Sequence, residues 1–223
     1  MLPAALLLVL LQSDADLARI AARVDGASAM QGEPASKERY LAGRAALKAG
    51  PKVLPHLAAL FPGKRTTWPP KTCGMSKFNP EEQTEIARVM LQFGEPAAEH
   101  LAPFLAKGDG FTRWMAEAML ARIPSASAVP SLIAALFQKQ DDELLRKALY
   151  GSTFRIFKTA KEYSDWYDEH AKATRAGWLA EALRLQDAAS LDRKASLDAV
   201  CILPADERLD ALLTAFVDSG WNE

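Results

Sequence analysis

Apolar residues recur along most of the chain at intervals of three and four positions, which is the spacing of one face of an α-helix. The clearest example begins with Asn79 as the capping residue and Pro80 at the first helical position, and Gly94 ends it. Its apolar face consists of Ile86, Val89, Met90 and Phe93. Alternating runs of β-branched and aromatic residues do not occur, so the pattern predicts an all-α chain with no sheet.

Similar stripes predict further helices joined by short connections. The second, ending before 107–110, has the inward residues Ala98, Leu101, Phe104 and Leu105. The third and fourth have inward faces made of Phe111, Trp114, Met115, Ala118 and Met119, and of Val129, Leu132, Ile133, Leu136 and Phe137. The repeat pattern departs after Phe157, where residues 158–165 replace the expected turn, and the last helices are expected at about 174–185, 190–202 and 206–218. Short connections favour antiparallel hairpins.

Two alignments indicate that the hairpins repeat. Leu91, Leu120 and Leu149 follow one another at equal steps of 29 residues and are predicted to be buried at equivalent places. The segment that starts at Gly50 also lines up with the segment that starts at Gly94, so that the histidines His56 and His100 coincide. The step between these two copies is 44 residues, and the excess is 62–79, which is predicted to be an inserted loop.

In these segments the chain resembles the HEAT-repeat superfamily, including the short bacterial repeats grouped with phycobilisome lyases. The resembling segments are 45–61, 86–105 and 116–137, with a weaker copy at 144–154. The resemblance implies a right-handed α-solenoid of antiparallel helical hairpins over 36–157, preceded by a helix and linker at 16–35. Trp166 and Trp178 lie in a segment similar to the tail that closes some HEAT blocks, so 158–223 is expected to pack on the solenoid as a helical extension.

The chain begins with an apolar run, Leu2 to Leu11, that contains no charge. It is too short to span a bilayer, but it fits the apolar core of a secretory leader, and Ser13 and Ala15 supply small residues after it. No basic residue precedes the run, and a buried first helix is the alternative. We therefore expect residues 1–15 to be a signal peptide of an exported protein, periplasmic or secreted; without that role the chain is expected to be cytoplasmic.

Charge and motifs narrow the chemistry. The 223 residues carry a formal net charge of −1, which disfavours bulk binding of nucleic acid. Nucleophile elbows, phosphate-binding loops and zinc spacings do not occur, so no catalytic residue, metal or cofactor is predicted. His56 and His100 are expected to share one surface, but two histidines are too few for a zinc site. Glu99-His100 reverses the His-Glu order of the HEAT hydroxylases.

The inserted loop is the segment for which a binding role is the strongest alternative to a structural one. It carries cations and aromatic residues without a single carboxylate, a combination suited to an acidic peptide, a phosphate or a glycan. The alternative is a proline-rich cover over the flank of the helices. The candidate binding residues are Lys64, Arg65, Trp68, Lys71, Lys77, His56 and His100.

The function predicted from the sequence is a non-catalytic scaffold that binds a protein or peptide of unknown identity along its second helices. An enzyme or chromophore-attachment factor on the same repeats is one alternative, and a nucleic-acid-binding solenoid similar to the HEAT-like DNA glycosylases is another. The first alternative requires a pocket with convergent titratable groups, and the second requires a basic stripe along one face. No transmembrane helix is expected, and the oligomeric state is left open.

Overall fold

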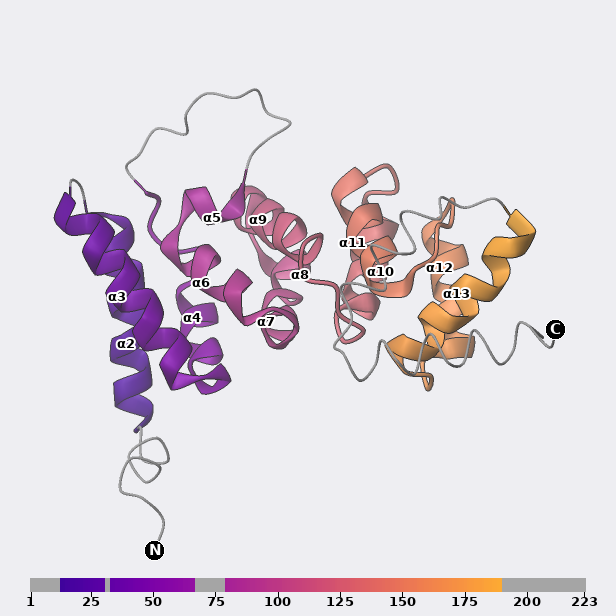
Figure 1. Ribbon diagram of the computed structural model, residues 1–223. Coiled ribbons are helices and arrows are strands. Elements are labelled where there is room, and N and C mark those ends of the chain that lie inside the picture. Colours follow the sequence, from indigo (N-terminus) through magenta and orange to yellow (C-terminus); the bar gives the residue numbers. More distant parts are fainter. Residues whose placement is uncertain (1–12, 31–32, 67–78, 190–223) are drawn as a thin grey trace, which may run out of the picture. The chain divides into compact units, whose positions relative to one another are not determined.

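A computed structural model describes residues 13–30, 33–66 and 79–189, and these residues are mainly α-helical (Figure 1). They contain no β-strand; within them, the one β-type pairing is an isolated antiparallel bridge between Arg65 and Thr84. The predicted all-α class is thus confirmed for this part of the chain. The chain divides between Ile123 and Pro124 into two compact units, called unit 1 and unit 2 below.

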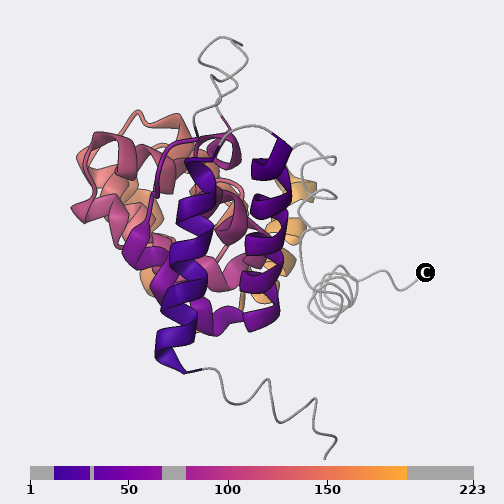
Figure 2. The same cartoon turned by 90° about the vertical axis from the view of Figure 1, so that its left-hand side faces the viewer.

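The described part of unit 1 consists of short helices around a core of Ala, Leu, Val, Ile and Met side chains. Helix α2 packs on α3, α4 and α6, and Figures 1 and 2 show α2 and α3 lying side by side. The elements are α2 (Asp14–Ser28), α3 (Glu33–Ala49), the 3-10 helix η1 (Pro51–Val53), α4 (Leu54–Leu60), α5 (Pro80–Gln83), α6 (Glu85–Phe93), α7 (Glu95–Leu101), α8 (Phe104–Lys107) and α9 (Gly110–Leu120).

The alignment of the Gly50 and Gly94 segments has a structural counterpart. Both glycines turn the chain at positive φ, 75° and 65°, which a residue with a side chain rarely adopts. The positions that follow are buried in the same order, and Leu57 and Leu101, at equivalent places on the contacting helices α4 and α7, are both fully buried. The repeat seen in the sequence therefore extends to backbone geometry and burial in unit 1.

The helix expected to run from Asn79 to Gly94 is broken in two. Thr84 is extended, with φ −146° and ψ 148°, and separates α5 from α6. Its backbone pairs with Arg65, and its hydroxyl accepts a hydrogen bond from the N–H of Ala87, so it caps α6. Asn79 stands at the N-cap position of α5 but makes no side-chain cap bond. The prediction of one helix was wrong because a partner distant in sequence holds Thr84 in an extended conformation.

Two further details of unit 1 differ from prediction. The helix after Gly94 is interrupted at Ala102 and Pro103, which divide it into α7 and α8. Leu91 is only half-buried, whereas Leu120 is 1% exposed and Leu149, in unit 2, is fully buried. The 29-residue step therefore does not give Leu91 the buried environment of the other two leucines.

The described part of unit 2 is built from the helices α10 (Val129–Gln138), α11 (Glu143–Thr153), α12 (Ala160–His170) and α13 (Arg175–Ala189). Helix α10 packs on α11 and α12, and α11 packs on α13. Helix α12 begins within the stretch 158–165, where the repeat pattern was predicted to depart, and a capping box of Thr159 and Glu162 starts it. Phe137 was placed in the core but is 51% exposed at the end of α10.

The chain ends bear on several predictions. Ser13 and Asp16 form a capping box that begins α2 at Asp14, so the last residues of the segment predicted to be a leader belong to the first turn of this helix. The apolar run Leu2 to Leu11 and the helices predicted at 190–202 and 206–218 lie outside the described residues. Within the residues that are described, no helix has the length and apolar character needed to cross a membrane.

Candidate functional site

The first residues of the inserted loop are held against the helices of unit 1 at several points. The backbone N–H of Lys64 donates to Asp25 Oδ1 at 2.7 Å, and its ammonium nitrogen lies 3.5 Å from Asp25 Oδ2. Thr66 donates its N–H to the carbonyl of Gln83 at 2.8 Å and its hydroxyl to the carbonyl of Glu82 at 2.6 Å. The segment Lys64–Thr66, called the anchor segment below, therefore connects α2 to the end of α5.

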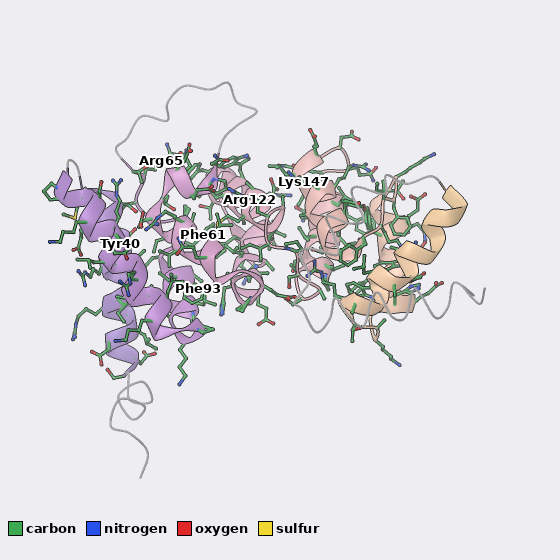
Figure 3. All side chains as sticks on the ribbon, viewed as in Figure 1. Tyr40, Phe61, Arg65, Phe93, Arg122 and Lys147 are labelled. Carbon is green, nitrogen blue, oxygen red and sulfur yellow. The ribbon has the colours of Figure 1, made fainter. Side chains whose placement is uncertain are left out.

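Arg65 links the same segment to α9. Its guanidinium carbon lies 4.1 Å from the centre of the Phe111 ring, within the range of a cation–π contact. Phe111 in turn stacks against Trp114, with ring centres 6.1 Å apart. Arg65 was predicted to bind a partner, and its guanidinium already covers an aromatic ring of its own chain (Figure 3 labels Arg65).

An acidic cap lies next to this contact. Asp109 accepts a hydrogen bond from the N–H of Thr112 at 2.7 Å and caps α9. Hydrogen bonds from Thr112 lower the pKa of the Asp109 carboxyl, and the positive charge of Arg65 lowers this pKa further. The anchor segment and the start of α9 thus form one continuous polar and aromatic surface.

An open hollow of about 330 Å³ lies in the same unit. Arg122 forms two contacts with the carboxylate of Glu81, one of them a hydrogen bond of 2.9 Å from Nη2 to Oε1 (Figure 3 labels Arg122). Arg88 is held by the buried carboxylate of Glu85, with Nε donating to Oε1 at 2.8 Å. Both guanidinium groups therefore have carboxylate partners. The lining residues are Glu81, Arg88, Leu91, Gln92 and Arg122.

The two histidines predicted to share a surface lie on helices that contact each other. His56 is on α4, and its Nε2 lies 3.0 Å from Asp14 Oδ1, which links α4 to the first turn of α2. His100 occupies the equivalent place on α7 and is half-buried. Across residues 13–30, 33–66 and 79–189, no group of three or more His, Cys, Asp or Glu side chains is placed to hold a metal ion.

Three of the predicted binding residues, Trp68, Lys71 and Lys77, lie outside the described part of the chain. The structure therefore locates only the start of the inserted loop. Of the residues it does describe, Lys64 and Arg65 lie together at that start, and both Lys64 and His56 contact carboxylates of α2.

Unit 2 contains a cluster that the sequence analysis did not assemble. The ring of His170 stacks on Trp166 at 4.9 Å; its Nδ1 lies 2.7 Å from the carbonyl oxygen of Trp166, and its Nε2 lies 3.3 Å from a carboxylate oxygen of Glu181. Glu181 also pairs with Arg155. The residues are separated along the chain, and only the proximity of Trp166 to His170 on one helix gave a signal in the sequence.

Aromatic rings surround this cluster. Trp178 donates its indole N–H to the carbonyl of His170 at 2.9 Å, and its ring lies 5.2 Å from that of Trp166. Tyr163 donates its hydroxyl to the carbonyl of Arg155 at 3.1 Å, and burial raises the pKa of the Tyr163 phenol. His170, Glu181 and Arg155 therefore bind one another within an aromatic wall, an arrangement that stabilises the packing of α12 on α13.

No protein-family model, curated protein or solved structure matches this chain.

Proposed function

We propose that the chain is a non-catalytic protein-binding scaffold, built as a right-handed α-solenoid of HEAT-like helical hairpins. The observation that carries this proposal is the repeated hairpin start at Gly50 and Gly94, where both glycines have positive φ and the positions that follow are buried in the same order. Stacked repeats of this kind create an extended surface that suits an elongated partner. The proposed partner is a protein or peptide.

The chemistry of the described charged groups supports the same proposal. Arg122, Arg88 and Lys64 are each matched with a carboxylate of unit 1. The carboxyls whose pKa is lowered, at Asp16, Glu38 and Asp109, lie at helix caps or in an ion pair, away from the lining of the hollow. Such pairing favours a structural use of charge over proton transfer.

The inserted loop is the part of the scaffold that we assign to partner contact. Its first residues, Lys64 to Thr66, are fixed to α2, α5 and α9, so a loop that starts there has a rigid base. The predicted loop residues Trp68, Lys71 and Lys77 supply the aromatic and basic groups that often dominate interface energy. Export of the protein to the periplasm or medium, with residues 1–15 as a leader, stays a prediction.

The test compares two loop variants by quantitative affinity capture from extracts of the source organism. One variant replaces residues 67–78 with a short Gly-Ser linker; the other is the pair Trp68→Ala and Lys71→Ala. Excision has to start after Thr66, because a deletion from residue 62 onwards would also remove the contacts of Lys64, Arg65 and Thr66. Joining the ends more directly changes closure entropy little, so thermal unfolding should stay close to that of the unaltered chain.

Loss of one specific protein from the captured material, with unchanged helical content and unfolding, would support the scaffold and its loop. A matched control is the pair Lys107→Ala and Lys147→Ala, which removes exposed lysines elsewhere and should leave capture unchanged. If no protein is enriched by the unaltered chain above an unrelated helical protein, the proposed function is wrong.

A further inference from the structure

Helix α3 exposes a row of positive charges that the inserted loop and the hollow do not include. Lys37, Arg44 and Lys48 are all exposed and follow one another at spacings of seven and four residues. On an α-helix these spacings bring side chains onto one line along the axis. The three residues, called the α3 cation row below, therefore form a single ridge of positive charge.

Apolar side chains flank the row on both sides. Tyr40 is 57% exposed and Leu47 is 38% exposed, and their seven-residue spacing places them along one edge of the row. Leu41, 40% exposed, lies on the opposite edge. Single exposed apolar residues are common on protein surfaces, but here three of them accompany three cations on a single face.

The one carboxylate between Lys37 and Lys48 is engaged away from the row. Glu38 is half-buried and pairs with Arg23 of α2, with Nη2 donating to Oε2 at 3.0 Å. Among the exposed side chains from Lys37 to Lys48 there is no carboxylate. Glu33, the first residue of α3, precedes this stretch by one turn. Among the side chains that the structure describes, no ion pair joins Lys37, Arg44 or Lys48 to a carboxylate, whereas Arg88 and Arg122 of the same unit each have one.

The described helices of unit 1 cover only the other side of α3. Its buried residues include Ala42 and Ala46, and the helices packed against it are α2 and α6. Figure 2 shows α2 and α3 from the side on which they stand in front of the rest of unit 1. Arg44 donates to the Tyr40 hydroxyl at 3.3 Å and its guanidinium lies 5.6 Å from the ring centre, so tyrosine and arginine are already arranged together (Figure 3 labels Tyr40).

We infer that this face of α3 binds an acidic amphipathic helix of a partner protein. A helix laid alongside α3, with carboxylates at the same spacings of seven and four residues, meets all three cations of the row, and its leucine or similar side chains meet Tyr40, Leu41 and Leu47. Opposite charges at matched spacing set the register and the orientation of such a pair. The inference rests on the proposed function, because it names the partner chemistry of a protein-binding scaffold.

The arrangement of the face decides against other occupants. Helices that lie on membranes place apolar residues at the centre of the buried face and cations at its edges, whereas α3 has the reverse order. A phosphate backbone would engage Lys37 and Arg44 but would leave the exposed leucines without an apolar partner. A second copy of the chain would bring its own cation row against this one, which like-charge repulsion opposes.

The test uses the full chain and a synthetic helical peptide with glutamates at spacings of seven and four residues, flanked by leucines. Binding is measured by fluorescence anisotropy at low and moderate salt. We expect the triple variant Lys37→Glu, Arg44→Glu and Lys48→Glu to bind this peptide on the order of 10-fold or more weakly. The same variant should gain binding to a peptide in which each glutamate is replaced by lysine, which a general loss of structure would not produce.

A matched control carries the same change of net charge at exposed lysines elsewhere, Lys107→Glu, Lys147→Glu and Lys172→Glu, and should bind the acidic peptide as the unaltered chain does. Equal weakening in both triple variants, or equal binding of a peptide with the same residues in scrambled order, overturns the inference. The inference is also overturned if the unaltered chain binds double-stranded DNA, or phosphatidylcholine vesicles containing phosphatidylserine, more tightly than the acidic peptide and the α3 triple variant loses that binding.

The result separates this inference from the proposed function. If the α3 triple variant still captures the partner that depends on the loop, while the acidic peptide fails to bind the unaltered chain, the scaffold stands and the α3 inference is wrong. If no partner protein is captured but the peptide binds through the row, the α3 site is real and the proposed role of the loop is wrong.

Discussion

Both units are built from α-helices, but different contacts hold the helices together in each unit. The helices of unit 1 are packed through small and aliphatic side chains. Hydrogen bonds between distant segments add to this packing, such as the one from the N–H of Glu85 to the Ser28 hydroxyl at 2.8 Å. Unit 2 instead gathers Trp166, Trp178 and Tyr163 around a paired histidine. Helices are thus packed together by aliphatic side chains in unit 1 and with the help of one aromatic cluster in unit 2.

The difference predicts where each unit is most sensitive. In unit 1 burial is spread over many medium-sized side chains, so any one of them contributes a moderate share. In unit 2 the buried rings of Phe154, Tyr163, Trp166 and Trp178 join an aliphatic core, and each aromatic ring buries more area than an aliphatic residue does. Single substitutions are therefore expected to have their largest effect in unit 2.

The largest expected effect is that of Trp178→Ala. Trp178 is 1% exposed, contacts the rings of Trp166 and Tyr167, and donates a hydrogen bond to His170. Removing it should lower the free energy of unfolding by about 3–5 kcal/mol, as expected for a buried aromatic residue. Chemical denaturation followed by near-ultraviolet circular dichroism would measure this. Trp114→Ala, at a half-buried residue of unit 1, should cost clearly less, and equal costs would remove the contrast between the units.

The next effect compares two leucines of unit 1 that the sequence aligned. Leu120 is 1% exposed, so Leu120→Ala should cost about 2–5 kcal/mol by leaving a cavity. Leu91 is half-buried at the edge of the hollow, and Leu91→Ala should cost less than half as much. Urea denaturation of the two variants would check the order. Similar losses would mean that Leu91 is buried after all and that the simple 29-residue repeat was right.

A smaller loss of stability is expected when the side-chain cap at the start of α6 is removed. The Thr84 hydroxyl accepts from the N–H of Ala87 at 3.1 Å, and Thr84→Val keeps the shape while removing this acceptor. The loss should be about 1 kcal/mol, typical of an N-cap. Thr159→Val, at the cap of α12, is the corresponding variant in unit 2. A change at Thr84 that leaves stability unaltered would show that its extended backbone, and not its hydroxyl, starts α6.

The two units should also respond to opposite ends of the pH scale. In unit 1, hydrogen bonds from Thr112 lower the pKa of Asp109 below 3.8, the ordinary value of an aspartate carboxyl. Its stabilising contribution is complete above that unfolded value and disappears as the pH falls through the lower, folded value. Asn remains a good cap and does not titrate, so Asp109→Asn should make acid unfolding of unit 1 less steep. Helical content followed during acid titration would measure this, and an unchanged slope would contradict it.

At alkaline pH the sensitive group is in unit 2. Burial raises the pKa of Tyr163 above 10.0, the ordinary value of a tyrosine phenol, so the folded state disfavours the phenolate. The stability that this group contributes is complete below pH 10.0 and is lost as the pH rises through the higher, folded value. Tyr163→Phe cannot ionise and should reduce the alkaline loss, although it removes the hydrogen bond to Arg155 at neutral pH. Alkaline titration at constant temperature would measure this: stability should fall less steeply with pH in Tyr163→Phe than in the unaltered chain.

Sequence reasoning succeeded where the cause of a structure is local. Asp142 caps α11 by accepting from the N–H groups of Leu144 and Leu145, at the start of the segment 144–154 that the sequence had indicated as helical. The turns at Gly50 and Gly94 were likewise readable, because glycine is the residue that best tolerates positive φ. Local propensity and spacing carry this information directly.

It failed where the cause is a contact between distant segments. The break at Thr84 depends on pairing with Arg65, and no pattern near Thr84 announces it. The cations Lys64 and Arg65 were identified as a group, but their partners Asp25 and Phe111 belong to other helices. The α3 cation row follows a spacing visible in the sequence, yet its exposure depends on which side of α3 the helices α2 and α6 cover.

The short extended pairing beside Thr84 makes unit 1 a candidate for grafting. Thr66 bonds to the carbonyls of Glu82 and Gln83, so the described chain on one side of the inserted loop lies beside the helix that begins just after it, at Pro80. A foreign segment placed between Thr66 and Asn79 would therefore begin and end at neighbouring points. Since each doubling of loop length costs only about 0.6 kcal/mol of closure entropy, a reporter peptide or a small binding module could be carried there with little loss of stability.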